Sequence, residues 1–286
     1  MSKAPPRSKS DARHDGFSKL AVLRMGANGR ERLPDKVITE TPVALVYNGV
    51  SFAVMMATPC DLADFALGFT LAEGIIANSR EFELVDLLKT DRGVSLQGLI
   101  PHTRFAALQQ RRRSLAGRSG CGLCGVEALE DAVLPLPQVQ SSASITRGAI
   151  ATGMRALTHG QPLNAITGGA HAAAFIRVGQ PAIVREDVGR HNALDKAIGA
   201  LAADTRSRDA MLARTAEGFL AITSRASWEM VHKAAHAGIA VIAAISAPTS
   251  LAIQAADAAG ITLIAFARDD AMNIYTHAGR IASTGC

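Results

Sequence analysis

The second half of this chain alternates short apolar runs with helical segments, and that alternation limits the fold more than any other feature of the sequence. The apolar runs cover residues 172–178, 182–184, 218–223, 239–245 and 261–266, and segments with helical spacing at 227–236 and 250–259 separate the last three. Buried strands that alternate with helices indicate a largely parallel sheet covered on both faces. The sequence therefore predicts an α/β fold.

The first half predicts a smaller unit of mixed α and β structure. Asn48-Gly49 between two apolar runs indicates a hairpin, because a tight turn needs positive φ at both central residues. Thr58-Pro59 is expected to open a helix whose apolar residues recur at helical spacing. Strands are expected around 83–89 and 94–100, followed by a helix around 104–115.

Three regions follow from these patterns. Residues 1–35 are charged and contain Ser, Pro and Gly, so we expect a disordered basic tail. Residues 36–135 form an N-terminal subdomain that includes a Gly-rich loop with two cysteines, and prolines and serines around 135–142 indicate a linker. Residues 136–286 form the α/β domain.

The Gly-rich loop Gly120-Cys121-Gly122-Leu123-Cys124-Gly125 carries the clearest chemical motif. Its two thiols follow a run of arginines, namely Arg111, Arg112, Arg113 and Arg118. Positive neighbours lower the pKa of a thiol and favour the reactive thiolate, and glycines let a partner approach the backbone closely. The loop therefore predicts sulfur chemistry at Cys121 and Cys124.

A Cys pair at this spacing can instead form half of a structural zinc site or a disulfide. The other cysteines, Cys60 and Cys286, are far from the pair, and no histidine occurs between His102 and His159. We expect no closed zinc site within one chain, while a site shared across a dimer stays open. Four cysteines in a long chain without a secretory leader favour reactive thiols over a disulfide.

The carboxyl ends of the predicted parallel strands form a second candidate site, because ligands bind there in open α/β sheets. Those ends read Ser224-Arg225, Ser246-Ala247-Pro248-Thr249 and Ala267-Arg268. Two of them lead into helix N-termini, whose free N–H groups favour anions. The hydroxyl side chains and two arginines predict a phosphate-binding rim. Helix capping is the alternative role for Ser224 and for Thr249.

A polar segment, residues 185–196, interrupts the apolar pattern of the second half. It predicts either a solvated loop followed by a capped helix start or an anion-binding cluster. In the second case Arg190 and His191 would bind the anion, with Asp187 orienting them.

Charge and hydropathy narrow the range of partners. The chain has 286 residues, a net charge of +5 and a pI of about 9.3, which suits an anionic partner such as a nucleotide or an acidic protein. Aromatic residues make up 4% of the sequence and do not cluster, so nucleic acid is not an expected partner. No apolar run approaches a membrane span, and we expect a cytoplasmic protein.

Missing motifs exclude several enzyme classes. The chain has no Gly-x-Ser-x-Gly elbow and no Gly-x-x-x-x-Gly-Lys loop. A zinc nucleobase deaminase needs His-x-Glu and Pro-Cys-x-x-Cys, whereas Gly precedes Cys121 and no His-x-Glu occurs. His232 and His236 lie four positions apart without the Glu of a zinc protease, so structural roles are expected for both and no metal is predicted.

Five motifs in this order closely resemble those of the FdhD family of formate dehydrogenase accessory sulfurtransferases. They are Pro42 to Gly49, Asp64 to Phe69, Gly120 to Gly125, Arg185 to Lys196, and Ser224 to Ser227 with Glu229-Met230-Val231. The resemblance runs from about residue 42 to residue 277, which is most of the chain.

The resemblance implies a sulfurtransferase that works through a cysteine persulfide. Family members accept sulfane sulfur from a cysteine desulfurase and pass it to the bis-molybdopterin guanine dinucleotide form of the molybdenum cofactor, before that cofactor enters formate dehydrogenase. The cofactor is then a transient substrate, and none is permanently bound. The family fold is similar to cytidine deaminase, a three-layer α/β/α domain with a smaller N-terminal α+β subdomain, and it implies a homodimer.

The resemblance also implies site residues. The persulfide would form on Cys121, with Cys124 as its companion. Contact with the guanine dinucleotide would fall on Ala267, Arg268, Asp269, Asp270, Ala271 and Met272, beside Ser224 and Arg225. The family often carries Gly and a basic residue where Asp269 and Asp270 stand, and two carboxylates repel a pyrophosphate unless they face the base or the sugar.

Two questions stay open at the level of sequence. Cys124 can take over the sulfur, or it can resolve a persulfide by forming a disulfide with Cys121. The chain can also be a non-enzymatic chaperone of the molybdenum cofactor, with its thiols acting as ligands or redox sensors.

Overall fold

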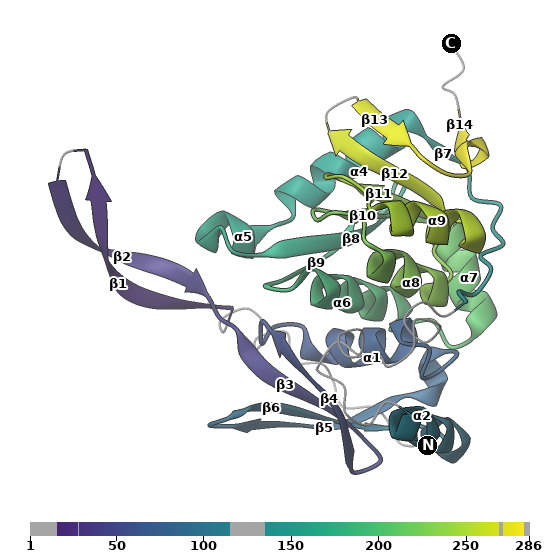
Figure 1. Ribbon diagram of the computed structural model, residues 1–286, viewed down its shortest axis with the longest axis horizontal. Coiled ribbons are helices and arrows are strands. Elements are labelled where there is room, and N and C mark those ends of the chain that lie inside the picture. Colours follow the sequence, from purple (N-terminus) through teal and green to yellow (C-terminus); the bar gives the residue numbers. More distant parts are fainter. Residues whose placement is uncertain (1–15, 28, 115–134, 269–270, 283–286) are drawn as a thin grey trace.

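A computed structural model describes residues 16–27, 29–114, 135–268 and 271–282, and Figure 1 shows two sheet-containing parts and a projecting β-hairpin. The N-terminal part holds a four-stranded sheet and the C-terminal part a six-stranded one. The mixed α/β class expected from the sequence is confirmed.

The larger sheet has the strand order β13-β12-β11-β10-β8-β9. Its strands are β8 (His171–Arg177), β9 (Ile183–Asp187), β10 (Gly218–Ile222), β11 (Val241–Ala244), β12 (Thr262–Arg268) and β13 (Ala271–Ile274). Only β10, β11 and β12 are mutually parallel, and the other three pairs are antiparallel. A largely parallel sheet is therefore the wrong expectation for the outer strands, because β8 and β9 are joined by a connection too short for a crossover helix.

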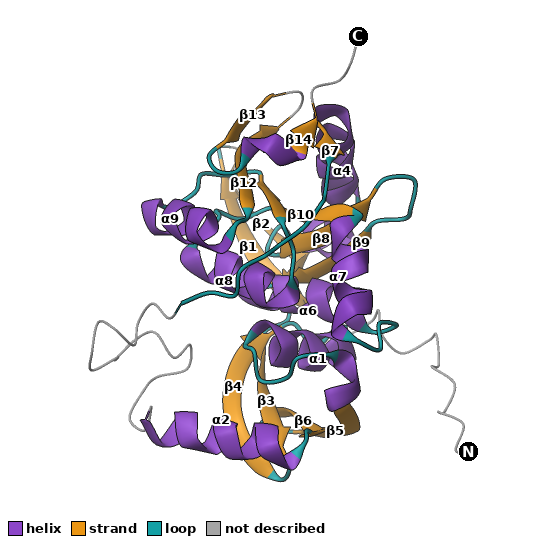
Figure 2. Ribbon diagram, turned by 90° about the vertical axis from the view of Figure 1, so that its right-hand side faces the viewer, coloured by secondary structure: helices purple, strands orange, loops and turns teal. Residues whose placement is uncertain are grey.

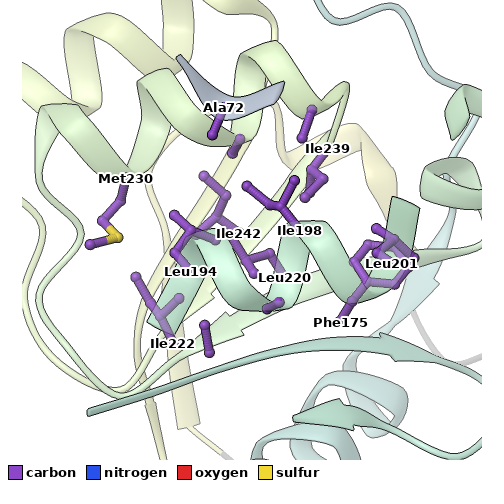
Figure 3. Packing of buried hydrophobic residues seen from close by; sticks show 14 of the residues in the cluster. Ala72, Phe175, Leu194, Ile198, Leu201, Leu220, Ile222, Met230, Ile239 and Ile242 are labelled. Carbon is purple, nitrogen blue, oxygen red and sulfur yellow. The ribbon is translucent and has the colours of Figure 1, made fainter. Parts of the chain in front are cut away.

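Helices cover both faces of this sheet (Figure 2). One face carries α4 (Arg147–His159), and the other carries α6 (Arg190–Ala202), α8 (Trp228–Ala237) and α9 (Ser250–Ala259). Alternate side chains of β10 pack against the helices on opposite faces of the sheet. Phe219 lies against Gly153 of α4, whereas Leu220 and Ile222 lie beside Leu194 of α6 (Figure 3). The remaining elements are α5 (Pro162–Thr167), α7 (Arg208–Ala216), β7 (Ile145–Thr146), a 3-10 turn at Ala278–Arg280 and β14 (Ile281–Ala282).

The N-terminal part has a sheet of order β4-β3-β6-β5. Its elements are β3 (Thr41–Tyr47), β4 (Val50–Ala57), α1 (Leu62–Ala72), a 3-10 turn at Ser79–Glu81, β5 (Glu83–Thr90), β6 (Gly93–Leu99) and α2 (His102–Ser114). The expected turn at Asn48-Gly49 is confirmed, with φ of 50° and 82°. Helix α1 begins at Leu62 rather than at Thr58, because Asp187 and Lys196 bind the backbone of Thr58.

The hairpin lies where the sequence predicts a disordered tail, so that prediction is wrong for residues 17–26 and 29–35. β1 (Phe17–Gly26) pairs antiparallel with β2 (Gly29–Ile38) over ten residue pairs. Its base is held by the protein body, because β2 packs against α5 and Ile38 lies against Gly169. The charged side chains of this segment favoured disorder, whereas its backbone pairs in an antiparallel ladder.

The two parts are joined where α1 packs on α6. A Cβ at Gly68 would lie 1.7 Å from the carbonyl oxygen of Asp195, and one at Gly199 would lie 1.8 Å from that of Asp64. The two helices therefore approach backbone to backbone. Beside this contact, the buried Lys233 ammonium binds Glu73 of the N-terminal part at 2.8 Å and Asp195 of α6 at 2.9 Å.

This buried group of one ammonium and two carboxylates predicts a pH-dependent stability. Burial raises the pKa of Asp195 to about 7, and the attraction of Lys233 offsets only part of that effect. An unfolded Asp loses its proton near pH 4, so between about pH 4 and pH 7 the native state holds a proton that the unfolded chain has lost. The contribution of this group to the free energy of unfolding is therefore expected to fall as the pH rises from about 4 to about 7.

Urea unfolding of wild type and Asp195→Asn at pH 5 and at pH 7.5 tests this expectation. Between pH 5 and pH 7.5 the free energy of unfolding should decrease less for the variant than for wild type. Asp204→Asn, at an exposed position, is the matched control and should keep the wild-type profile. If the free energies of unfolding of wild type and Asp195→Asn changed equally between the two pH values, the pH dependence would not come from Asp195.

Candidate functional site

The loops that follow the three parallel strands meet at one edge of the large sheet. Ala226 and Pro248 form a parallel bridge, and the N–H of Thr249 donates to the carbonyl of Ala226 at 3.0 Å. The guanidinium of Arg268 donates through Nε to the carbonyl of Ile245 at 3.0 Å. These contacts join residues 223–227, 245–249 and 266–268 into one surface, which we call the rim.

The rim contains several residues that the sequence singled out. Ser224 and Arg225 follow β10, and Ala267 and Arg268 end β12. Both arginines are exposed at this edge, whereas Ser224 and Ala267 are buried. The predicted juxtaposition of the two strand ends is therefore observed, and it places two cationic side chains on the same edge of the sheet.

The capping alternatives for the two hydroxyl residues have opposite outcomes. Thr249 is the N-cap of α9 and accepts from the N–H of Ala252, so its capping role is confirmed. Ser224 does not cap α8, because its hydroxyl donates to the carbonyl of Arg225 and the N-cap position belongs to Ser227.

Two polar groups at the start of α8 have no hydrogen-bond partner within the described residues. They are the Ser227 hydroxyl and the Trp228 indole N–H, and both polar atoms are buried. A buried polar group without a partner costs roughly 1–3 kcal/mol, so most native structures satisfy such groups. The two residues follow Arg225 by two and three positions in the chain.

Phe266 is a rim residue that the sequence analysis missed. Its φ is 52°, the residue is 41% exposed, and its N–H donates to the carbonyl of Ser246 at 3.2 Å. A bulky residue in the left-handed region is an outlier, and such strain often marks a binding site. The strain follows from an irregularity in the pairing of β12 with β13. No local sequence pattern predicts that irregularity.

The polar segment 185–196 forms a cluster beside the rim, with different pairings from those predicted. His191 Nε2 lies 2.5 Å from a carboxylate oxygen of Glu229, and Arg190 lies 4.0 Å from the same carboxylate. Asp187 does not orient them. It is fully buried and pairs with Lys196 at 2.6 Å, and it accepts from the N–H groups of Thr58 and Gly189.

The charges of the cluster partly cancel, because the Glu229 carboxylate lies against Arg190 and His191. The contact with His191 lowers the pKa of Glu229 and outweighs its burial, so this carboxylate stays ionised. Burial lowers the pKa of His171, and the charges of Arg190 and His191 lower it further. His171 pairs with Asp187 at the start of β8, which meets the end of β10 where Thr223 accepts from the N–H of Ala172. The cluster and the rim are therefore adjacent.

The paired histidines of α8 pack against each other, and His232 also packs against Trp228. The ring of His232 stacks between Trp228 and His236, with centroid distances of 5.1 and 4.4 Å. Within the described residues, no three His, Cys, Asp or Glu side chains are grouped so as to hold a metal ion.

Four predicted site residues lie outside the described residues: Cys121, Cys124, Asp269 and Asp270. Their roles stay predictions. Ala271 and Met272 lie on β13, where Ala271 pairs with Arg268, and Met272 is half-buried against the core. Within the part of the chain that the structure describes, no helix is long and apolar enough to cross a membrane.

Fold and site together define an α/β protein with a cationic strand-end rim suited to an anionic ligand. The model of the FdhD/NarQ family matches residues 38–282. The chain is 51% identical over 267 residues to a Xanthomonas axonopodis pv. citri protein named sulfur carrier protein FdhD, covering 92% of each chain. It is 49% identical over 248 residues to the Variovorax paradoxus protein of that name, covering 86% of this chain and 87% of the relative.

A solved structure supports the fold. A protein from Desulfotalea psychrophila, described as a formate dehydrogenase accessory protein, superposes with a TM-score of 0.69 at 24% identity, over 93% of this chain and 99% of that one. The family match and the relatives establish that the chain belongs to the FdhD/NarQ family.

Proposed function

We propose that this protein is a sulfur carrier that moves persulfide sulfur from a cysteine desulfurase to the bis-molybdopterin guanine dinucleotide form of the molybdenum cofactor, before formate dehydrogenase receives it. The observation that carries the proposal is the Cys-x-x-Cys loop in a chain about half identical to proteins named sulfur carrier protein FdhD. The proposal includes a cytoplasmic homodimer and a deaminase-like C-terminal domain, the latter supported by helices on both faces of its sheet.

The loading step is a thiol exchange. The Cys121 thiolate attacks the outer sulfur of the desulfurase persulfide, a new sulfur–sulfur bond forms on Cys121, and the desulfurase cysteine leaves as a thiolate. The step needs no oxidant or reductant. Arginines before the loop, Arg111 to Arg113 and Arg118, favour the attacking thiolate through their charge.

Two roles for Cys124 agree with this chemistry. It can accept the outer sulfur from Cys121 in a second exchange, which regenerates the Cys121 thiolate. Alternatively, its thiolate attacks the inner sulfur of the persulfide, which forms the Cys121–Cys124 disulfide and releases the outer sulfur as hydrosulfide. In the second role the hydrosulfide leaves with the electron pair of the broken sulfur–sulfur bond, and the Cys124 thiolate supplies the pair of the new disulfide bond.

The rim is the proposed binding site for the guanine nucleotide of the cofactor. Arg225 and Arg268, both exposed at this edge, offer charge to the pyrophosphate. The exposed Phe266 ring offers a stacking surface for the base.

The rim assignment predicts that Arg225→Ala weakens GDP binding by about tenfold, since one charge-assisted hydrogen bond contributes roughly 1.5 kcal/mol or more. Calorimetry with GDP measures the effect. Arg155→Ala, an exposed arginine on α4, is the control and should bind GDP as wild type does. Equal affinities for GDP and ADP would refute guanine recognition, and equal losses in both variants would place the nucleotide elsewhere.

Mass spectrometry of wild-type protein incubated with a cysteine desulfurase and cysteine tests the carrier function. The expected result is a gain of one sulfur atom that maps to the peptide containing Cys121 and Cys124 and disappears on treatment with a reductant. Binding of GDP without any gain of sulfur would favour the alternative, a cofactor chaperone whose thiols do not carry sulfur.

A further inference from the structure

A cavity of about 340 Å³ lies where the two parts of the protein meet. Helix α1, which lies between the small sheet and α6 (Figure 1), forms one wall, and residues that follow α6 form another. The other lining residues come from the 3-10 turn at Ser79–Glu81 and the start of β5. Small-molecule sites typically have volumes of roughly 300–1,000 Å³ and often lie between domains. The cavity therefore has the volume and the position of a site for one small molecule.

The cavity lies apart from the rim. Helix α6 begins at Arg190, in the cluster beside the rim, and ends at Ala202, next to Ala203 of the cavity. Its 13 residues rise roughly 1.5 Å each, so about 20 Å separate the two ends of the helix. A molecule in the cavity therefore does not use the residues proposed to bind the guanine nucleotide.

Apolar and cationic side chains share the lining of the cavity. Leu67, Phe82 and Leu84 are half-buried, so part of each apolar residue stays open to the cavity. Arg80 and Arg206 are exposed and line the same cavity. Among the residues that the structure describes, neither guanidinium has an ion-pair or hydrogen-bond partner. The cavity therefore combines an apolar surface with two available cations.

The carboxylates near the cavity are already bound by other arginines. Asp64, which belongs to the lining, accepts from Arg185 through Nη2 at 2.7 Å and through Nε at 2.9 Å. Glu81, next to Arg80 in the chain, pairs with Arg104 at 2.8 Å. The charges of Arg80 and Arg206 are thus left without compensation by these groups. Two like charges that line one cavity repel each other, and an anion between them would remove that repulsion.

The backbone at both arginines is held in place. The N–H of Arg80 donates to the Asn78 side chain at 3.1 Å. The Ser79 hydroxyl donates to the carbonyl of Thr205, which precedes Arg206, so the two cationic segments are tied to each other. A site whose segments are already fixed loses less conformational entropy on binding. Only the two arginine side chains would have to become ordered around an anion.

We propose that this cavity binds a small phosphate monoester that carries an apolar group. Arg80 and Arg206 hold the phosphate, and the surface formed by Leu67, Phe82 and Leu84 holds the apolar group. A phosphate monoester carries close to two negative charges at neutral pH, which matches the two guanidinium groups, and its oxygens accept paired hydrogen bonds from arginine. A monocarboxylate would leave one positive charge unmatched. The proposal is independent of the sulfur-carrier function.

Isothermal titration calorimetry of the full-length protein with phenyl phosphate tests the proposal. Wild type should bind phenyl phosphate at least about tenfold more tightly than inorganic phosphate, phenol or benzoate, each of which lacks one feature of the probe. Arg80→Gln with Arg206→Gln should weaken binding by at least about tenfold, because charge-assisted hydrogen bonds are lost. Arg147→Gln with Arg155→Gln, two exposed positions on α4, removes the same net charge and should change the affinity less than about twofold.

Two single variants locate the probe more closely. Ala63 is an exposed residue of the lining, and Ala63→Glu adds a carboxylate there without removing an arginine, so it should also weaken binding of phenyl phosphate. Arg225→Ala, at the rim, should bind phenyl phosphate as wild type does. The urea midpoint of unfolding of each variant shows that the fold is intact.

Several outcomes would overturn the proposal. Equal losses in the two double variants would assign binding to net charge, and a loss in Arg225→Ala alone would place phenyl phosphate at the rim. Equal affinities for phenyl phosphate and inorganic phosphate would show that the apolar surface is not used, and equal affinities for phenyl phosphate and benzoate would show that the site does not select a phosphate. Wild type that does not bind phenyl phosphate would refute the site.

Discussion

Lys196→Met is expected to lower the free energy of unfolding by about 3–5 kcal/mol, which is the usual cost of leaving one member of a buried ion pair without its partner. Lys196 and Asp187 are both fully buried, and their charged atoms lie 2.6 Å apart. The ammonium also donates to the carbonyl of Thr58 at 2.8 Å. Methionine fits the length of the lysine stem, so the change removes the charge with little change of volume.

Urea unfolding at constant pH measures this effect. Lys19→Met, at an exposed position on the hairpin, is the control and should change the free energy of unfolding by less than about 0.5 kcal/mol. Adding Asp187→Asn to Lys196→Met should restore part of the stability, because the uncompensated charge is then gone. A double variant that is less stable than Lys196→Met would show that the loss does not come from the unpaired carboxylate.

The same ion pair joins the N-terminal part to the polar segment 185–196. Asp187 accepts from the N–H of Thr58 and Lys196 donates to its carbonyl, so one residue between β4 and α1 is bound from both sides by the end of β9 and by α6. Asn192 extends the link by donating to Asp187 and to the carbonyl of Met56. Destabilising this group is therefore expected to disturb the position of Arg190 and His191, which begin α6.

Local signals made much of the fold predictable. Asn48-Gly49 specifies its turn through backbone conformation, and the runs around β10, β11 and β12 are apolar because both of their faces are buried. The juxtaposition of Arg225 with Arg268 followed from a general property of parallel strands, whose carboxyl ends lie on one edge. Each of these inferences needs only a few neighbouring residues or a rule of topology.

The features that escaped prediction depend on contacts distant in sequence. The pairing of His191 with Glu229 joins the starts of two helices 38 positions apart, and the Asp187 that is nearest in sequence is already bound to Lys196. The left-handed Phe266 follows from the irregular pairing of β12 with β13. The hairpin was missed because its charges lower mean hydropathy, although each strand still alternates between two faces.

Cys121→Ala is expected to reduce formate dehydrogenase activity to the level of a strain that lacks the protein. The thiolate is the nucleophile that takes sulfur from a persulfide donor, and alanine offers no atom that can form that bond. Activity assays in a complemented deletion strain measure the effect, with mass spectrometry showing that the loop no longer gains sulfur. Cys60→Ala removes a thiol that lies against Gly16 at the base of the β1–β2 hairpin. It is the matched control, and it should retain most of the activity.

Cys124→Ala distinguishes a carrier from a chaperone more finely than Cys121→Ala does. In both roles proposed for Cys124, this thiol removes sulfur from Cys121, so its loss should leave the Cys121 persulfide intact and allow it to accumulate while dehydrogenase activity falls. If the thiols were only ligands or sensors, neither variant would show a persulfide, and the two would lose activity together. No other thiol of this chain stands between two glycines in a Cys-x-x-Cys pair. Full activity of Cys121→Ala, with unchanged expression and an unchanged urea midpoint of unfolding, would nevertheless exclude Cys121 as the sulfur-carrying residue.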